Sequence, residues 1–210
     1  GCDRDDVIAK SERALAASRV AGFETNLLLL RDVLKLEKFR SGEVSTALLR
    51  DFSYSVPTFE VLTPGAQTTV QDYPGRLGHW NVGVPPSGPM DDYHFRLANR
   101  IVGNAENAPG LEMTLSGATL RFNCKALIAV TGGDFPLKLN NMPVERNCPC
   151  EVHPGDVLKI GVTRCGQRCN LAVRGGIDVP EYLGSRSTFT LGRFGGHGGR
   201  ALAAGDVLHI

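Results

Sequence analysis

The sequence predicts a mainly β protein, an antiparallel barrel or sandwich, preceded by a short α-helical segment. From Phe59 onward, short apolar runs alternate with Gly, Pro, Asn and Asp at a spacing of roughly 8–12 residues, which is typical of antiparallel β folds. Helical spacing of apolar residues is confined to residues 3–50 and 92–102. The change of pattern across residues 51–58 indicates a boundary between the two parts.

Residues 3–19 are expected to form an amphipathic helix, because mostly apolar residues fall on one face of it at steps of three, four and seven. Asp3 is expected to cap this helix, since a carboxylate there accepts hydrogen bonds from unpaired amides of the first turn. Gly22 is expected to end it. The face turned inward consists of Val7, Ile8, Ala14, Leu15 and Ser18.

A second helix, rich in leucine, is expected after Thr25, which caps it, and a third short helical segment is expected at residues 43–50. Three such helices expose more apolar surface than they cover among themselves. An independent three-helix bundle and the tail of a larger upstream domain are both open, and we favour the second. The chain begins at Gly1 and its first methionine is Met90, so we expect a piece of a longer polypeptide.

Residues 51–58 are expected to form a linker, because the segment is polar and aromatic, contains proline and shows no periodicity. The expected division is a helical segment 1–50, the linker 51–58 and a β domain 59–210. Within the β domain, the runs expected as strands are FEVLTP, TTVQD, HWNVGVP, LEMTL, ATLRF, ALIAVTG, LKLN, CEVHPG, DVLKIGV, CNLAVRGG, STFTLG and DVLHI.

Two loops and a helix start are expected between Thr63 and Asn104. Residues 63–76 and 82–92 are the loops, and the second contains three prolines and two glycines between Val82 and Met90, which excludes a helix or a central strand. Two aspartates follow, at positions 91 and 92, and the helical spacing then runs to residue 102. We therefore expect a helix there with an acidic N-terminus.

A short string, Gly-Asp-Val-Leu, occurs at residues 155–158 and again at residues 205–208. Two copies 50 residues apart do not make a solenoid repeat. Gly-Asp before Val-Leu is typical of a tight turn that leads into a buried strand.

Long strings of the β domain resemble a known family. TVQDYPGRLG, GVPPSGPMD and FRLANRIVGN, followed by EMTLSGATLRF, AVTGGDF and GGIDVPEYLGSRSTF, resemble the carboxyltransferase half of urea carboxylase. The same module is similar to the proteins called allophanate hydrolase subunit 2 and to a 5-oxoprolinase subunit. The resemblance covers residues 59–210. It implies a cyclophilin-like antiparallel β-barrel and implies that the chain holds about the N-terminal half of the full carboxyltransferase module.

The helical segment resembles the very end of a biotin carboxylase domain, where a helix is followed by a G-x-x-TN turn and a second helix. Gly22, Thr25 and Asn26 match that turn. The resemblance implies an upstream ATP-grasp core and no catalytic residue within residues 1–50. In the full-length enzyme it implies biotin and ATP with Mg²⁺ as cofactors, with none bound by this fragment.

The resemblance implies part of a biotin-dependent C–N ligase, urea carboxylase, which makes allophanate from urea, ATP and bicarbonate, within a chain such as urea amidolyase. The implied partners are the rest of the polypeptide, namely the biotin carboxylase core, the second carboxyltransferase half and the biotin carrier, together with urea or a related small amide. The alternative is a stand-alone binding, regulatory or 5-oxoprolinase-subunit-type module. The helical tail favours the first, since stand-alone relatives are expected to begin near Phe59.

Carboxyl transfer requires groups that polarise the donor carbonyl and a group that takes a proton from the acceptor nitrogen. The residues we single out for substrate binding are Gln71, Asp72, Ser87, Asp91, Arg96 and Asn99. Structural alternatives remain: Asp72 as the cap of its own turn and Asp91 as a helix cap. Arg96 pairing with a carboxylate and Asn99 satisfying buried backbone groups are further alternatives. The pattern assigns no residue to catalysis.

Composition excludes several other classes of function. A net charge of +1 gives no reason to expect nucleic acid or a membrane surface, and no apolar run approaches the ~20 residues that span a bilayer. A cytoplasmic protein with six reduced cysteines and no metal site is expected, because the spacing Cys148-x-Cys150 is too short for a structural zinc site. GGHGGR, residues 195–200, is expected to be a flexible hairpin that exposes His197.

Overall fold

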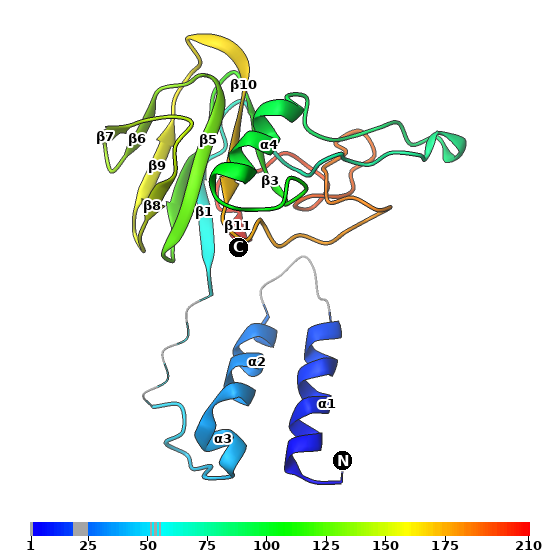
Figure 1. Cartoon of the computed structure of the whole chain (residues 1–210), viewed down its shortest axis with the longest axis vertical. Helices are drawn as coiled ribbons and strands as arrows, with labels where there is room; N and C mark the ends of the chain where they lie inside the picture. Colours follow the sequence, from blue (N-terminus) through cyan, green and yellow to red (C-terminus); the bar gives the residue numbers. More distant parts are fainter. Residues whose placement is uncertain (1, 19–24, 51, 53, 55) are drawn as a thin grey trace. The chain divides into compact units, whose positions relative to one another are not determined.

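The computed structural model describes residues 2–18, 25–50, 52, 54 and 56–210. The chain divides into two compact units, Gly1–Val56 and Pro57–Ile210 (Figure 1). The first unit is helical and the second is built mainly from β-strands.

The helical unit contains α1 (Arg4–Ala17), α2 (Leu27–Lys35) and α3 (Glu37–Ser41), and α1 packs against the other two. Asp3 caps α1 as the sequence predicts, since its Oδ1 accepts the Asp6 amide at 2.8 Å. The Thr25 hydroxyl lies 3.5 Å from the Leu27 amide, at the limit of a hydrogen bond. The predicted end at Gly22 falls outside the described residues.

The third helix lies earlier than the sequence analysis expects. α3 ends at Ser41, and Gly42 follows in the left-handed conformation, with φ 89°. Residues 46–50 form turns instead of a helix, because their amides reach back three residues, as from Leu48 to Ser45 at 3.0 Å. The predicted helix at 43–50 is therefore wrong.

The β unit consists of two antiparallel sheets. The six-stranded sheet has the order β11 (Val207–His209), β1 (Thr58–Thr63), β4 (Thr119–Phe122), β9 (Val157–Ile160), β6 (Leu137–Leu139), β7 (Met142–Val144). The five-stranded sheet has the order β2 (Gln67–Gln71), β3 (Gly110–Thr114), β10 (Cys165–Val173), β5 (Ala126–Asp134), β8 (Cys150–Val152). Antiparallel β structure after a helical segment is thus confirmed. The strands pair within two separate sheets, so no closed barrel forms among residues 57–210.

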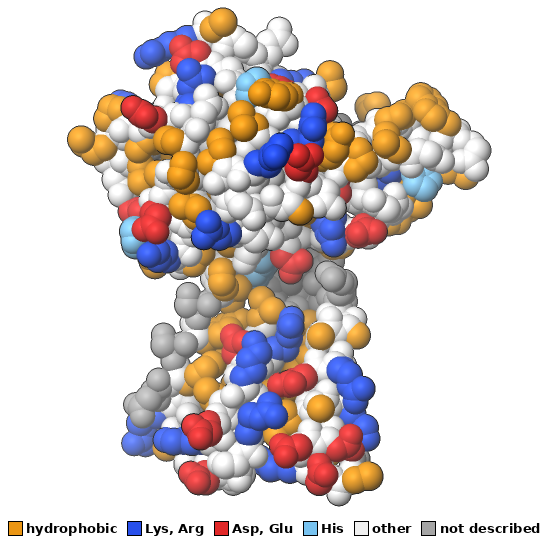
Figure 2. Space-filling model, viewed as in Figure 1, with side chains coloured by type: hydrophobic (Ala, Val, Ile, Leu, Met, Phe, Trp, Pro, Cys, Tyr) orange, Lys and Arg blue, Asp and Glu red, His pale blue; other side chains and the backbone are white. Residues whose placement is uncertain are grey.

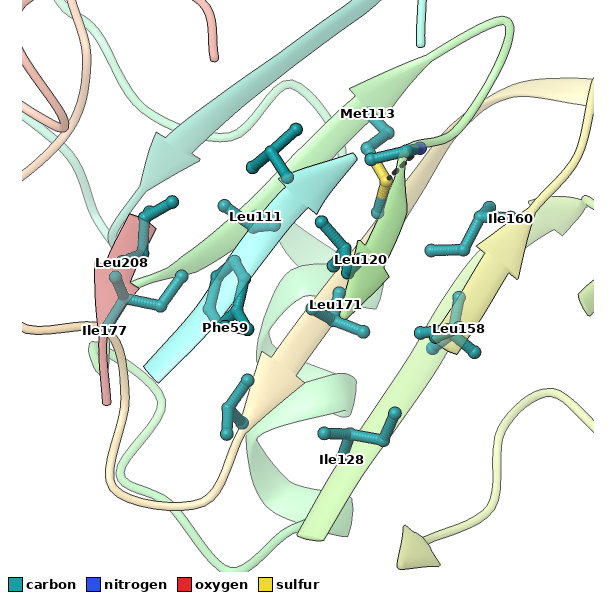
Figure 3. Close-up of a cluster of buried hydrophobic side chains, with 14 of the residues drawn as sticks. Phe59, Leu111, Met113, Leu120, Ile128, Leu158, Ile160, Leu171, Ile177 and Leu208 are labelled. Carbon is teal, nitrogen blue, oxygen red and sulfur yellow. Dashed lines mark hydrogen bonds between the residues drawn. The ribbon is translucent and has the colours of Figure 1, made fainter. Parts of the chain in front are cut away.

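The main hydrophobic core lies between the two sheets, and Figure 3 shows side chains of both sheets pointing toward one another. Alternate residues of each strand supply it, as two-residue periodicity requires. The largest contributors include Phe59, Phe122, Leu120 and Leu158 from one sheet, and Leu111, Met113, Ile128 and Leu171 from the other. This burial fixes which side chains of the five-stranded sheet face away from the core.

Helix α4 (Asp92–Ile101) covers that outer face of the five-stranded sheet (Figure 1). It lies where the sequence predicts a helix over 92–102. Ala98 and Val102 pack on Ala129 and Ala172, which alternate with core residues along β5 and β10. The N-terminal end of α4 is thereby held above the polar half of the same face.

Two predicted strands are wrong and one was missed. HWNVGVP forms a loop with a short 3-10 helix, η1 (Trp80–Val82), and the exposed Trp80 finds no neighbouring strand among the described residues. STFTLG forms an irregular segment and a turn, with a bridge between Phe189 and Phe194 and a hydrogen bond from the Thr188 amide to the Val70 carbonyl at 2.9 Å. The missed strand is β7, three residues long and containing a proline, so its periodicity is too short to recognise.

Candidate functional site

A fully buried arginine connects the loop between β2 and α4 with the segment that follows β10. Arg76, 1% exposed, donates from Nε to the Tyr182 carbonyl at 3.0 Å and from Nη1 to Ser87 Oγ at 2.8 Å. Its Nη2 donates to the carbonyls of Ser185 and Ser187 at 3.2 and 3.0 Å. Burial lowers the pKa of Arg76, while Asp72 nearby opposes the shift. Three of these hydrogen bonds fix the loop after β2 against the segment after β10, and the fourth, to Ser87, stays within that loop.

Asp72 completes what we call the arginine cluster, formed by Asp72, Arg76, Ser87, Ser185 and Ser187. The Asp72 carboxylate accepts from the hydroxyls of Ser185 and Ser187, both at 2.6 Å. Its Oδ2 accepts the amide of the intervening residue 186 at 2.7 Å. Asp72 therefore anchors a segment more than 110 residues away in sequence and does not cap its own turn, so that alternative is wrong. Both carboxylate oxygens are occupied by protein donors.

A second cluster surrounds the N-terminal end of α4, and we call Asp91, His94, Glu112, Thr131 and Arg168 the α4 cluster. Asp91 caps the helix, since its Oδ1 accepts the His94 amide at 3.2 Å. Its Oδ2 accepts from His94 Nδ1 at 2.8 Å. The Asp91 amide donates to Glu112 Oε1 at 3.0 Å, and the Thr131 hydroxyl donates to the His94 carbonyl at 2.7 Å.

Glu112 lies under this helix end, only 3% exposed. Burial raises its pKa, and the Asp91 amide and Arg168 partly oppose that rise. Arg168 Nη1 lies 3.4 Å from Glu112 Oε2 and donates to Thr114 Oγ1 at 2.6 Å. A buried carboxylate with these partners holds the turn before α4 onto the sheet.

A buried polar row crosses the sheet at the level of Glu112. Its members are opposite one another in register: Thr69 on β2, Glu112 on β3, Asn170 on β10 and Thr131 on β5. Among the described residues, the side-chain oxygen and nitrogen of Asn170 are buried without a hydrogen-bond partner, as is Oε1 of Gln71. Leaving such groups unpaired costs about 1–3 kcal/mol each, so a polar partner such as water or a ligand is favoured there.

The six residues singled out from the sequence fall into different settings. Gln71 donates to Thr69 Oγ1 at 2.9 Å beside the polar row, and Ser87 and Asp72 belong to the arginine cluster. Arg96 lies over the Tyr73 ring at 4.8 Å and bonds Asp92 at 3.3 Å. The remaining residues are Asp91, the cap described above, and Asn99, whose Nδ2 donates to the Ala108 carbonyl at 2.9 Å. The structure thus brings Asp72 and Ser87 together and places Asp91 in the other cluster.

Several residues of the two clusters escaped the sequence analysis. Arg76 lies inside one of the quoted strings and His94 lies between two of them, yet nothing in their spacing marked them. Glu112 lies in a strand where the neighbouring residues are apolar, and a lone carboxylate in such a run is the signal that was available. Ser185 and Ser187 were unrecognisable because their partners are distant in sequence.

The loop between β2 and α4 also carries an uncharged, apolar surface. Residues 77–90 contain no Asp, Glu, Lys or Arg. Leu77, Trp80, Val82 and Met90 are exposed, with Trp80 at 68%. Figure 2 shows apolar side chains gathered at the tip of this loop.

Metal-binding groups do not converge in the part of the chain that the structure describes, where no three His, Cys, Asp or Glu side chains are placed to share an ion. All six cysteines are free thiols, and burial raises the pKa of Cys169 to about 12. His197 is half-buried and lies 3.6 Å from Asp206, so the prediction that it is exposed is wrong. None of the described helices has both the length and the apolar character needed to cross a bilayer.

Comparison with known proteins gives a consistent set of relatives. Residues 82–210 match the family model described as "Carboxyltransferase domain, subdomain A and B". Over its whole length the chain is 53% identical to urea amidolyase of Lachancea kluyveri and 49% identical to urea amidolyase of Saccharomyces cerevisiae. It spans only 12% and 11% of those proteins.

Two further matches cover part of the chain and the whole chain. A 5-oxoprolinase subunit of Haemophilus influenzae is 36% identical over 149 residues, which are 71% of this chain and 48% of that protein. The crystal structure of K. lactis urea amidolyase superposes on the whole chain with a TM-score of 0.88 and 51% identity, and the match covers 13% of that structure.

Proposed function

The chain belongs to the family of carboxyltransferase domains, subdomain A and B, and on that premise we propose that it forms part of a biotin-dependent urea carboxylase. The observation that carries the proposal is the match to urea amidolyase over the whole chain, at 53% identity in sequence and a TM-score of 0.88 in structure. Because the chain spans about an eighth of those proteins, it supplies one segment of the enzyme.

Within that enzyme we assign residues 1–50 to the end of the biotin carboxylase domain, 51–58 to a linker and 59–210 to the N-terminal half of the carboxyltransferase domain. The extent of the matches supports this division. Urea amidolyases match the whole chain, whereas the 5-oxoprolinase subunit matches 71% of it. We propose the cyclophilin-like barrel only for the complete carboxyltransferase domain.

Two cofactors follow from the proposed function, and this chain fits only one of them. Biotin supplies the carboxyl group that is transferred, and its ureido ring offers N–H donors and a carbonyl acceptor. The unpaired Oε1 of Gln71 is an acceptor suited to such an N–H. ATP with Mg²⁺ does not fit here: GGHGGR lacks the Lys-Ser/Thr of a phosphate loop. Its backbone instead packs so tightly on Ser187 and Thr188 that a Cβ at Gly195 or Gly196 would collide with them.

The proposed roles follow from the two clusters. The arginine cluster holds the loops in place, because Asp72 and Arg76 spend their hydrogen-bonding capacity on protein groups. Gln71 has an unpaired Oε1 and Asp91 holds the partly exposed His94, and we assign both residues to substrate positioning. Arg96 and Asn99 keep α4 and its following loop in place through their contacts with Tyr73 and Ala108. Ser87 positions the second loop through Arg76.

The test uses the full-length enzyme with Asp91→Ala. Loss of a helix cap costs about 1 kcal/mol of stability. If Asp91 also serves the site, urea-dependent ATP turnover falls well beyond what that loss explains, roughly tenfold or more for each 1.4 kcal/mol of lost transition-state stabilisation. Asp3→Ala is the matched control, since Asp3 caps α1 in the same way. Normal turnover with a slightly lower melting temperature would show that Asp91 is only a cap.

A second candidate function is that of a 5-oxoprolinase subunit, supported by the 36% identity over 149 residues. It is distinguished by substrate. ATP-dependent turnover with 5-oxoproline and none with urea would favour it over the urea carboxylase.

A further inference from the structure

The α4 cluster leaves one ring nitrogen of His94 without a hydrogen-bond partner. His94 Nδ1 is bound to Asp91 at 2.8 Å, while its Nε2 has no partner among the described residues and the side chain is 36% exposed. Resting on the proposed function, we propose that His94 is the residue that takes the proton from the acceptor nitrogen during carboxyl transfer, with Asp91 as its positioning residue.

The ring of His94 is fixed from several sides. Its amide is bound by the Asp91 cap, and its carbonyl accepts from Thr131 at 2.7 Å. The Tyr93 ring packs edge-on against the imidazole at a centroid distance of 5.1 Å. Asp91 is itself held through its amide by Glu112. The imidazole is therefore oriented before any substrate arrives, which is what an efficient base requires.

The hydrogen bond to Asp91 also decides which nitrogen carries the proton. A carboxylate only accepts, so Nδ1 must be the donor, and neutral His94 then keeps its lone pair on Nε2. This is the arrangement by which a carboxylate orients the base of a nucleophile–base pair. The Asp91 carboxylate also stabilises the imidazolium that forms when Nε2 takes up a proton.

Other acids of the two clusters are poorly placed for the same task. Both oxygens of Asp72 accept protein donors, and Glu112 is buried and faces the Asp91 amide and Arg168. Asp91 is occupied by His94. Nε2 of His94 is thus the unpartnered basic atom of the α4 cluster.

The step balances without any further reactant. The acceptor nitrogen forms a bond to the carboxyl carbon while the bond from that carbon to the donor nitrogen breaks. The proton of the acceptor nitrogen passes to His94 Nε2. Nε2 then delivers it to the departing donor nitrogen, which restores neutral His94.

Kinetics of the full-length enzyme test the role directly. His94→Gln should lower kcat for urea by on the order of 100-fold, the lower range for general-base catalysis, and should remove the acidic limb of the kcat/KM pH profile. The bicarbonate- and ATP-dependent half-reaction, measured without urea, should stay unchanged. His153→Gln is the matched control, since His153 is an exposed histidine with Asp156 three residues on, at 3.8 Å, in the turn between β8 and β9.

A readout independent of turnover uses the 210-residue chain itself. Nitrogen NMR shifts of His94 should show the proton on Nδ1 in the neutral form, and Asp91→Asn should shift the ring toward a mixture of tautomers. His153 should show a mixture in both proteins.

The outcomes separate the two levels of the proposal. If the wild-type enzyme turns over no urea, the proposed function fails and the role of His94 fails with it. If wild type is active and His94→Gln matches it in kcat and pH profile, only the role of His94 is overturned. A mixture of His94 tautomers in the wild-type chain also overturns it.

Discussion

Asp156 and Asp206 occupy equivalent positions in the repeated Gly-Asp-Val-Leu string, before β9 and β11. Each accepts the amide three residues earlier, from His153 at 2.8 Å and from Ala203 at 2.7 Å. Asp206 in addition binds Arg200 through two hydrogen bonds of 2.7 Å. The repeat therefore marks a shared turn, as the sequence suggests. The bonds to Arg200 are expected to make the Asp206 turn contribute more to stability than the Asp156 turn.

These contacts predict a pH dependence of stability. The pKa of Asp206 is lowered from its ordinary value of 3.8: burial opposes this, and the hydrogen bonds from Arg200 and the Ala203 amide outweigh burial. Because its pKa is lowered in the folded state, the ionised Asp206 stabilises the protein fully above pH 3.8. This stabilisation is lost as the pH falls through the folded-state pKa. Asp206→Asn should cost roughly 2 kcal/mol at pH 7. Urea denaturation should show this difference shrinking below pH 3.8.

Asp156→Asn is the control for that measurement, because it retains the turn but has no arginine partner. In the wild-type protein the pKa of Asp156 is lowered mainly by the side-chain hydrogen bond from Asn140. At pH 7, Asp156→Asn should lower the free energy of unfolding by less than Asp206→Asn does. An equal cost, or a difference for Asp206 that persists unchanged in acid, would contradict the assignment.

At the scale of elements, the segment 182–199 surrounds the guanidinium of Arg76 with backbone carbonyls and with the ring of Phe194, whose centroid lies 4.9 Å from the guanidinium carbon. The approach is close: a Cβ at Gly195 would lie 2.1 Å from the Ser187 carbonyl and 2.7 Å from Arg76 Nη2. Gly184, in the same segment, has the same φ of 73° but open space around it. The two glycines separate the cost of backbone conformation from the cost of a steric clash.

Gly184→Ala should cost about 1 kcal/mol, the penalty of a left-handed conformation for a residue with a Cβ. Gly195→Ala should cost at least about 2 kcal/mol more, because the carbonyl and guanidinium must also move. Chemical denaturation of the two variants measures the difference. Equal costs would mean that the Arg76 cage is looser than its distances indicate.

The sequence analysis succeeded where an element depends on its own residues and failed where it depends on distant ones. Alternation identified most strands, and the acidic start and helical spacing located α4. Periodicity could not show that the run containing Trp80 lacks a neighbouring strand. The hydrogen bonds from Ser185 and Ser187 to Asp72 could not be predicted from local sequence, since they join residues more than 110 positions apart. Of the candidate site, Asp91 was found as a cap, but its contact with His94 required the structure.

For the whole molecule, the division into Gly1–Val56 and Pro57–Ile210 makes a prediction about access to protease. Limited proteolysis should cut first between about residues 50 and 58, because exposed connections are cut before folded elements. Mass spectrometry of the first fragments identifies the site. First cleavage within residues 120–190, with this segment intact, would contradict the proposed linker.

The central claim is that this chain is one segment of a urea carboxylase and acts only together with the rest of that enzyme. Allophanate formation from urea, ATP and bicarbonate tests it most directly, measured in parallel for the full-length polypeptide and for the 210-residue chain. We expect allophanate from the full-length polypeptide and none from the isolated chain. Allophanate from the isolated chain, or none from the full-length polypeptide, would contradict the claim.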